Sequence, residues 1–272
     1  MIVARALTKS YRRKEVLRGV SFVAQPGEIT LLVGPNGAGK STTLKLLAGL
    51  MRPDGGEALI AGKDIFRDQL AAQGQLSFMP QMPAFHPRFT CRQIVDFYAG
   101  LRGVARSRCE SVLAAAGLEA VAREQTHTLS GGMRQRLGLA LLLLPDAPVL
   151  LLDEPGLSLD PDWRRRLQGI LHQEAHRGKT VLITTHLIAE WNNVAHRCLL
   201  CRDGVIAREL DPANLPDDFD EEASARHPSR TESGTGRLPA DLSAKASGEG
   251  RVSAMGRRGD PSNLDKMPTP LP

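Results

Sequence analysis

Aromatic side chains are scarce in this sequence of 272 residues, since Phe, Trp and Tyr together make up only 4% of it. This scarcity excludes a core built on stacked rings, and we expect the apolar residues, 42% in all, to pack mainly through Leu, Val, Ile and Ala. An aliphatic core of this kind suits an α/β fold. The length is sufficient for one large domain with an appendage.

Cysteines are also few, and no secretory signal pattern opens the sequence. The four cysteines are irregularly spaced, which argues for free thiols in a reducing compartment and against a disulfide framework. We therefore expect a cytoplasmic protein. Cys198 and Cys201, with His196 nearby, invite a metal hypothesis, but residues three apart on a predicted strand point to opposite faces, which disfavours a shared ion.

Long hydrophobic runs are missing as well. The longest apolar stretch, residues 137–152, is broken by Pro145 and Pro148, and it is too short to cross a hydrocarbon layer of roughly 30 Å. The sequence therefore predicts no membrane-spanning segment.

Charge is spread unevenly along the chain. The formal net charge is +5, yet the part after Leu210 contains eleven acidic and eight basic residues, so the preceding body is the more basic part. A basic body could face anionic lipid, nucleic acid or nucleotide phosphates, and charge alone does not choose among them. Residues 211–272 form a polar tail, and we expect 216–272 to be disordered because this segment has few apolar side chains to bury.

The hydrophobic pattern alternates between strand-like and helix-like segments. Strands are predicted at residues 2–7, 16–24, 29–33, 58–60, 149–152 and 181–185, and helices at 41–50 and 162–177. Between them, residues 90–124 have helical periodicity, with one apolar stripe at Ile94, Phe97, Tyr98 and Leu101 and another at Val112, Leu113 and Ala116. This order predicts a mainly parallel core sheet with a helical subdomain inserted at about 83–135.

A phosphate-binding pattern, G-x-x-x-x-G-K-S, directly follows the predicted buried strand 29–33 and opens a helix. Its glycines would let backbone N–H groups converge on phosphates, Lys40 would reach the β- and γ-phosphates, and the hydroxyl of Ser41 would bind Mg²⁺. We therefore predict that the chain binds ATP and Mg²⁺ with Gly34, Pro35, Asn36, Gly37, Ala38, Gly39, Lys40, Ser41 and Thr42.

Two adjacent carboxylates, Asp153 and Glu154, follow the apolar strand 149–152. Parallel sheets bind ligands at the carboxyl ends of their strands. Asp153 is placed to hold Mg²⁺, and Glu154 to orient or deprotonate the attacking water. A polar turn after a core strand is the alternative reading of this pair when it is considered alone.

A Leu-Ser-Gly-Gly sequence at residues 129–132 lies between these two motifs and opens another helical run. Here the sequence resembles the ATP-binding-cassette (ABC) ATPase family, whose signature loop has this form. The resemblance covers about residues 2–210, which would form an ABC ATPase domain with a P-loop NTPase core, an N-terminal antiparallel β subdomain and the inserted helical subdomain. It also implies that Ser130, Gly131 and Gly132 contact nucleotide.

Four further positions match the family pattern. The resemblance implies that Gln81 contacts Mg²⁺ and water, and that His186 contacts the γ-phosphate. It also implies that the loop Ser-Leu-Asp at 158–160, with Asp160, crosses to the opposite subunit, and that Tyr11 stacks on adenine. Individually, each of Gln81, His186 and Tyr11 has an ordinary structural reading. There are two departures from the pattern: Met133 stands where glutamine is usual, and Gly156 stands where threonine or serine is common.

For the whole protein, the resemblance implies an ATPase that works as a head-to-tail pair of cassettes, most simply a homodimer, on the cytoplasmic face of a membrane. Its partner would be a separate transmembrane permease that docks on the helical region 83–126, and short local features lean towards export. Lys40, Gln81, Glu154 and His186 would be the catalytic residues. The alternative is a soluble ABC ATPase acting on nucleic acid or ribosomes. We expect no nucleic acid partner, because such relatives usually carry two cassettes or a long coiled-coil insertion.

Overall fold

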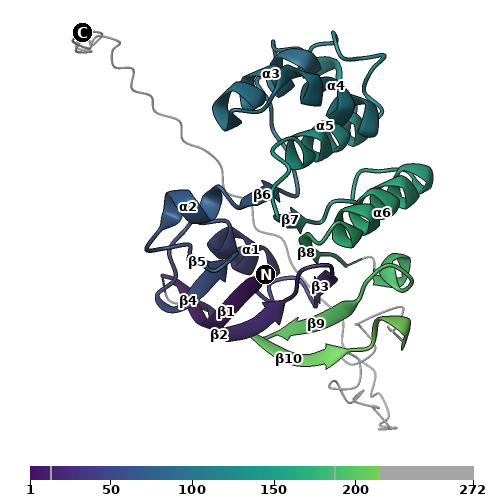
Figure 1. The fold of residues 1–272 in the computed structure, drawn as a ribbon. Helices are drawn as coiled ribbons and strands as arrows, with labels where there is room; N and C mark the ends of the chain where they lie inside the picture. The colour runs from purple at the N-terminus through teal and green to yellow at the C-terminus, as the bar shows by residue number, and fades with distance from the viewer. Residues whose placement is uncertain (13, 187, 215–272) are drawn as a thin grey trace, which may run out of the picture. The chain divides into compact units, whose positions relative to one another are not determined.

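Two β-sheets organise the part of the chain that the computed structural model describes, residues 1–214 apart from 13 and 187 (Figure 1). The core sheet has six strands in the order β10-β9-β3-β8-β7-β6, and its five strands from β9 to β6 run parallel. Their bounds are β3 Ile29–Val33, β6 Leu76–Met79, β7 Val149–Asp153, β8 Thr180–Thr184, β9 Arg197–Arg202 and β10 Val205–Leu210. The predicted parallel core is confirmed, with one antiparallel strand, β10, at its edge.

The second sheet is antiparallel and contains the N-terminal strands in the order β2-β1-β4-β5. Its strands are β1 Ile2–Tyr11, β2 Lys14–Ala24, β4 Gly55–Ile60 and β5 Lys63–Asp64. β1 and β2 extend beyond the predicted runs because their polar ends pair across a hairpin, from Thr8 opposite Arg18 to Tyr11 opposite Lys14. This sheet is the predicted antiparallel subdomain.

Two longer helices and one short helix pack around the two sheets. They are α1 Lys40–Leu47 and α6 Pro161–His176, together with the shorter α2 Gln69–Gln73. Three short 3₁₀ turns lie at Thr126–Thr128, Ile188–Trp191 and Pro212–Asn214. α1 ends at Leu47, three residues before the predicted end, because Gly49 adopts a left-handed φ of +68°.

The inserted helical region contains α3 Cys91–Arg102, α4 Arg106–Ala115 and α5 Gly131–Leu143. The predicted apolar stripe of α3 is wrong in part: Ile94 is buried, but Phe97, Tyr98 and Leu101 are 53%, 41% and 66% exposed. The helix instead buries Cys91, Ile94, Val95 and Ala99. The second stripe is confirmed, since Val112, Leu113 and Ala116 are all buried.

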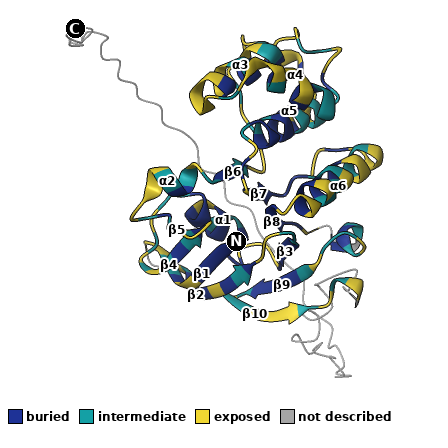
Figure 2. Cartoon of the chain, viewed as in Figure 1, coloured by how far each residue is buried: buried dark blue, intermediate teal, exposed yellow. Residues whose placement is uncertain are grey.

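The core sheet separates two hydrophobic clusters (Figure 2). Alternation along β3 sends Ile29, Leu31 and Val33 to the cluster shared with α3–α6, and Leu32 to the cluster shared with α1 and the N-terminal sheet. β9 alternates in the same way, so Cys198 lies in the first cluster and Cys201 in the second. The two thiols therefore face opposite sides of the sheet.

The predicted disordered tail, 216–272, lies outside the described residues. Within the described part of the chain, no helix is both long enough and apolar enough to cross a membrane.

Candidate functional site

The phosphate loop, residues 34–41, connects the end of β3 to the start of α1. Two of its glycines are required by geometry. Gly34 has a φ of +139°, and a Cβ there would lie 2.0 Å from the carbonyl oxygen of Cys201 on β9. Gly39, the N-cap of α1, has a left-handed φ of +103°, and a Cβ there would lie 2.4 Å from Leu17 Cδ2. The loop is therefore fixed against β9 and β2, and the amino end of α1 faces the space that the loop encloses.

Lys40 is buried at the first position of α1. Its Nζ donates to the carbonyl oxygens of Gly34 at 2.7 Å and Pro35 at 3.2 Å, so the ammonium group lies inside the curve of the loop. Burial lowers the pKa of Lys40, while Glu154, Cys201 and Asp153 act in the opposite direction. A partly desolvated cation at this place is suited to an anionic ligand such as a phosphate.

Asp153, at the end of β7, is held next to the loop by two hydroxyl groups. Ser41 Oγ donates to Asp153 Oδ1 at 3.0 Å, and Thr184 Oγ1 donates to the same oxygen at 2.6 Å. Thr184 reaches Asp153 because the parallel register of β7 and β8 places the two residues opposite each other. Thr184 is absent from the residues predicted for the site, although the alignment of two parallel strands was a signal that could have found it.

Glu154 follows Asp153 with a left-handed φ of +49°, a strained backbone conformation for a residue with a side chain. Its N–H donates to Thr184 O at 3.0 Å, and its Oε2 accepts from the backbone N–H of His186 at 3.3 Å. His186 Nδ1 lies 2.8 Å from the same Oε2. An ionised carboxylate only accepts hydrogen bonds, so Nδ1 of His186 donates its proton to Oε2 of Glu154.

Gln135 is a second residue that sequence reasoning missed. Its side chain is buried, and its Nε2 donates to the carbonyl oxygen of Pro155 at 3.1 Å and towards that of Glu154 at 3.4 Å. Gln135 lies in α5, the helix that the Leu-Ser-Gly-Gly sequence opens. It therefore links that helix to the strained turn that carries Glu154.

A cleft joins these elements, and we call it the nucleotide cleft. It is lined by Lys14, Val16, Asn36, Gly37, Gly39, Lys40, Ser41, Thr42, Gln81 and Glu154. Gln81 thus lies with the phosphate loop, as expected, although it is distant in sequence. Tyr11 is not one of the described residues that line the cleft. It lies at the end of β1, and its hydroxyl contacts Met51 Sδ at 3.1 Å.

The remaining predicted residues lie outside the nucleotide cleft. Ser130 is the exposed N-cap of α5, and its Oγ accepts from the N–H of Met133 at 3.1 Å. Asp160 is the exposed N-cap of α6, and its Oδ1 accepts from the N–H of Trp163 at 2.9 Å. The loops are neighbours, because a Cβ at Gly132 would lie 3.0 Å from the carbonyl oxygen of Ser158. Together Ser130, Gly131, Gly132 and Asp160 form a second set of predicted nucleotide ligands.

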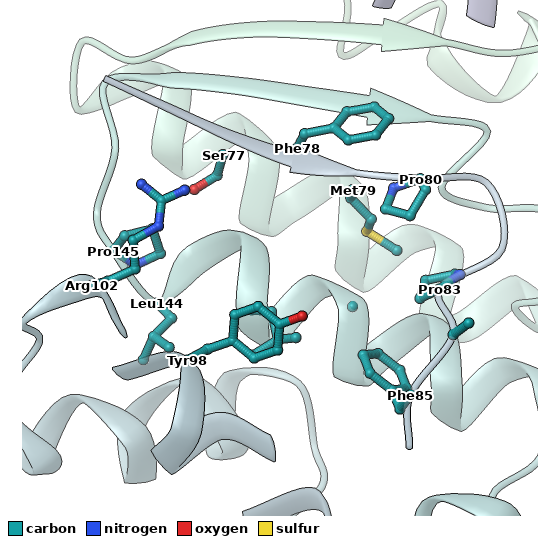
Figure 3. A pocket seen from close by; sticks show the side chains of 13 residues that line it. Ser77, Phe78, Met79, Pro80, Pro83, Phe85, Tyr98, Arg102, Leu144 and Pro145 are labelled. Carbon is teal, nitrogen blue, oxygen red and sulfur yellow. The ribbon is translucent and has the colours of Figure 1, made fainter. Parts of the chain in front are cut away.

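A groove lies between the core sheet and the helical region (Figure 3). One wall is β6 with the segment 80–85 that follows it, and the other contains Tyr98 and Arg102 of α3 and Leu141 of α5. Figure 3 shows the ring of Tyr98 facing Phe85 and Met79 across the groove. The segment 80–85 in this wall also carries Gln81, which lines the nucleotide cleft, so the two hollows share this segment.

Comparison with known proteins identifies the family of the chain. Residues 17–156 match the ABC transporter family model. The Nod factor export ATP-binding protein I of Paraburkholderia xenovorans is 38% identical over 211 residues, which are 76% of this chain and 69% of that protein. An uncharacterized ABC transporter ATP-binding protein of Bacillus subtilis is 35% identical, with 76% of this chain and 70% of that protein covered.

Solved structures give the same assignment. The ATP-binding subunit of an ABC transporter has a TM-score of 0.73 and 26% identity, with 84% of this chain and 95% of that chain covered. A dimeric ATP-binding cassette in a post-hydrolysis state, bound to ADP and Pi, has a TM-score of 0.73 and 27% identity, with 79% of this chain and all of the other covered. These comparisons give no support to the alternative of action on nucleic acid or ribosomes.

The fold and the solved relatives confirm the predicted α/β P-loop architecture. The chain belongs to the ABC transporter family, as a single-cassette ATP-binding subunit that binds and hydrolyses ATP for a transporter.

Proposed function

We propose that two copies of this chain pair head to tail, so that ATP in the nucleotide cleft of one copy is covered by Ser130, Gly131, Gly132 and Asp160 of the other. The observation that carries this proposal is the separation of the two sets of ligands. Lys40, Ser41 and Glu154 meet in one cleft, whereas Ser130 and Asp160 are exposed at the amino ends of α5 and α6. Helix amino ends suit phosphate, and a second molecule can reach them.

Within the cleft, Lys40 would face the β- and γ-phosphates and Glu154 would orient and accept a proton from the attacking water. His186 would keep Nδ1 on Glu154, and an N–H at Nε2 would donate to an oxygen of the γ-phosphate, because phosphate oxygens only accept hydrogen bonds. Both groups are held by backbone contacts with β8 and its following turn, so the reacting geometry is set before nucleotide arrives.

Mg²⁺ fits the donors at the edge of the cleft. Ser41 offers a hydroxyl, Asp153 a carboxylate and Gln81 an amide oxygen, and these hard oxygen donors suit an ion that keeps several waters and shares phosphate oxygens. When bound, the ion would neutralise charge that develops on the phosphates. The chain's part is to hold Asp153 at the right place, through Thr184 and Ser41.

Tyr11 would stack on the adenine ring. The tyrosine is 44% exposed at the tip of the β1–β2 hairpin. Lys14, which pairs with Tyr11 in that hairpin, lines the nucleotide cleft. This pairing with a residue of the cleft supports the proposed role of Tyr11.

The groove next to β6 would receive a cytoplasmic segment of a separate transmembrane permease, which would keep the ATPase peripheral on the cytoplasmic face of the membrane. Apolar side chains dominate its walls, and the exposed Phe97 and Leu101 of α3 extend the apolar surface beyond it. Movement of the segment 80–85 would carry the signal to Gln81. Since several relatives are named export ATP-binding proteins, we propose export as the direction of transport.

Glu154→Gln tests the proposed function. We expect ATP hydrolysis to fall by about 10²- to 10⁴-fold, because the carboxylate that takes the proton is gone, while ATP binding persists. Since the nucleotide remains uncleaved, this variant should become a dimer when ATP is added, as measured by sedimentation. A variant that stayed monomeric at saturating ATP would contradict head-to-tail pairing, and co-purification with ribosomes or DNA in place of a polytopic membrane protein would favour the alternative function.

A further inference from the structure

Trp163 occupies an unusual place on the first turn of α6. The guanidinium carbon of Arg136, in α5, lies 4.0 Å from the centre of its ring, and that of Arg166 lies 4.6 Å away. The edge of the ring faces Gly117, where a Cβ would lie 2.6 Å from Cζ2 of the indole. We call Gly117, Arg136, Trp163 and Arg166 the tryptophan node.

The node joins three helices through the carboxyl end of α4. Arg136 Nε donates to the carbonyl oxygen of Ala116 at 2.8 Å, and its other nitrogen donates to that of Gly117. Arg166 reaches the carbonyl oxygen of Ala114 at 3.3 Å. The carbonyl of Ala114 also accepts from the N–H of Gly117 at 2.8 Å. The two arginines therefore add side-chain donors to the carbonyl groups at and just beyond the end of α4.

The node holds two positive charges, Arg136 and Arg166, close together, and their mutual repulsion has to be offset. Burial and the charge of Arg166 lower the pKa of Arg136, whereas Asp160 acts in the opposite direction. The electron-rich faces of an indole attract guanidinium groups and offset part of their repulsion. A simple apolar side chain at position 163 would fill space but would leave the two cations uncompensated.

The node lies close to the exposed ligands at the amino ends of α5 and α6. Ser130 caps α5, and its Oγ accepts from the N–H of Met133 in the first turn, whereas Arg136 extends from the second turn of the same helix. Asp160 caps α6 by accepting from the N–H of Trp163 itself. Fixing Arg136 to Trp163 therefore fixes the amino ends of α5 and α6 relative to each other.

We propose that Trp163 is a positioning residue for the reaction: by holding Arg136 and Arg166, it sets the spacing of Ser130 and Asp160, so that both meet the partner's nucleotide together. This inference rests on the proposed head-to-tail pairing. Trp163 does not lie in the nucleotide cleft of its own chain, so its effect should be on closure of the pair and not on the first binding of ATP. No part of the ABC family pattern described above includes a tryptophan at this position.

The test compares Trp163→Leu, Trp163→Phe and Arg165→Ala in the full-length protein. Leu keeps apolar bulk but has no ring face, whereas Phe restores one. Arg165 is the matched control, because it is exposed on the same turn and pairs with Asp162, which lies outside the node. Each variant is made with and without Glu154→Gln, and we measure ATP-dependent dimerisation by sedimentation, kcat and KM for ATP, and binding of a fluorescent ATP analogue.

We expect Trp163→Leu to raise the ATP concentration for half-maximal dimerisation about tenfold, and to lower kcat by a similar factor, since small misplacements of reacting groups have effects of this size or more. Analogue binding should stay within about twofold of the parent, as for a surface change away from the cleft. Trp163→Phe should recover most of the loss, and Arg165→Ala should match the parent.

Three results would overturn the inference, and each has a different meaning. If the Glu154→Gln protein dimerises with ATP, and Trp163→Leu leaves both that transition and kcat unchanged, the node does not position the loops and the pairing still stands. If Glu154→Gln alone never dimerises, the pairing fails and this inference fails with it. Weaker analogue binding in Trp163→Leu, with kcat unaltered, would also reject a role confined to closure.

Discussion

The α/β core and the helical region present their predicted nucleotide ligands in different ways. In the core, Lys40, Asp153 and Glu154 are buried, and hydrogen bonds from the loop and from β8 hold each of them. In the helical region, Ser130 and Gly131 are exposed at a helix end. The difference is the one that the proposed head-to-tail pairing requires, in which one chain carries two half-sites, a buried one in its core and an exposed one that a second molecule can reach.

The largest effects should separate these two halves. Lys40→Ala should weaken ATP binding by about 10- to 100-fold, the usual size for a charge-assisted hydrogen bond, and should also abolish turnover. Ser130→Arg should abolish turnover as well, because its long cationic side chain blocks closure over the partner's nucleotide. The affinity of the Ser130→Arg monomer for an ATP analogue should stay within about twofold of that of the parent.

Equilibrium binding of a fluorescent ATP analogue, combined with phosphate release at saturating ATP, makes the comparison. Arg165→Ala, which lies outside both half-sites, is the control for each measurement. Equal loss of analogue binding in Lys40→Ala and Ser130→Arg would contradict the division into two half-sites. Normal turnover in Ser130→Arg would reject the covering role of Ser130.

A second comparison concerns two glycines, one in each half-site. Gly34→Ala should lower the free energy of unfolding by about 3 kcal/mol, since its φ of +139° is strained for any side chain and a Cβ would lie 2.0 Å from Cys201 O. Gly131→Ala should change it by less than about 1 kcal/mol, because its nearest neighbour, Ser158 Cβ, would be 3.7 Å away and alanine favours helices. Urea unfolding of both variants, followed by circular dichroism, measures the contrast. Equal destabilisation would mean that the phosphate loop is no more tightly fixed than the signature loop.

The sequence predicted the chemistry of the site better than the packing around it. Glycine, lysine and carboxylates at fixed spacing after buried strands have few other uses, so the phosphate loop and Asp153 were accessible without coordinates. The contacts of Gln135 with the Glu154 turn, and of Trp163 with Arg136, join segments that only the fold brings together. A single sequence carries no local signal for such contacts.

The error in α3 has a definite physical cause. Two sets of residues in α3 follow helical spacing. One is the predicted stripe, Ile94, Phe97, Tyr98 and Leu101, and the other is the set that the fold buries, Cys91, Ile94, Val95 and Ala99. Periodicity shows that a helix has an apolar face, but α3 has apolar residues over more than one face. The large side chains were assigned to the core, whereas the core takes the smaller ones and leaves the aromatic rings beside the groove.

The two faces of α3 give a third prediction. Ile94→Ala should lower the free energy of unfolding by about 2–4 kcal/mol, because it removes a fully packed side chain from the cluster under α3. Phe97→Ala should stay within about 0.5 kcal/mol, because the ring is 53% exposed and its aromatic contact is with Tyr98 on the same surface. Thermal and urea unfolding of the two variants measure the difference. A large loss of stability in Phe97→Ala would restore the stripe that the sequence suggested.

The smallest effects should come from the cysteines, which occur in pairs in the two regions. Cys91 and Cys109 lie in the helical region, and Cys198 and Cys201 in the core sheet, all buried. Burial raises the pKa of all four thiols, to about 12 for Cys198 and to about 11 for Cys201. Since the thiolate is the reactive form, none should react rapidly with a thiol reagent in the folded protein at pH 8.

Alkaline pH should then distinguish the core pair. Burial raises the pKa of Cys201 from 9.0 to about 11. Below pH 9 the thiol is therefore protonated in both the folded and the unfolded state, and it adds no pH dependence to the free energy of unfolding. As pH rises from about 9 to 11, only the unfolded chain releases the proton, and the free energy of unfolding falls. Urea unfolding of the parent and of Cys201→Ala at several pH values isolates this contribution, because the other titrating groups are common to both proteins. The free energy of unfolding of the parent should fall more steeply than that of Cys201→Ala across that window. Parallel pH profiles would mean that the Cys201 thiol is more accessible to solvent than its contact with Ala38 O implies.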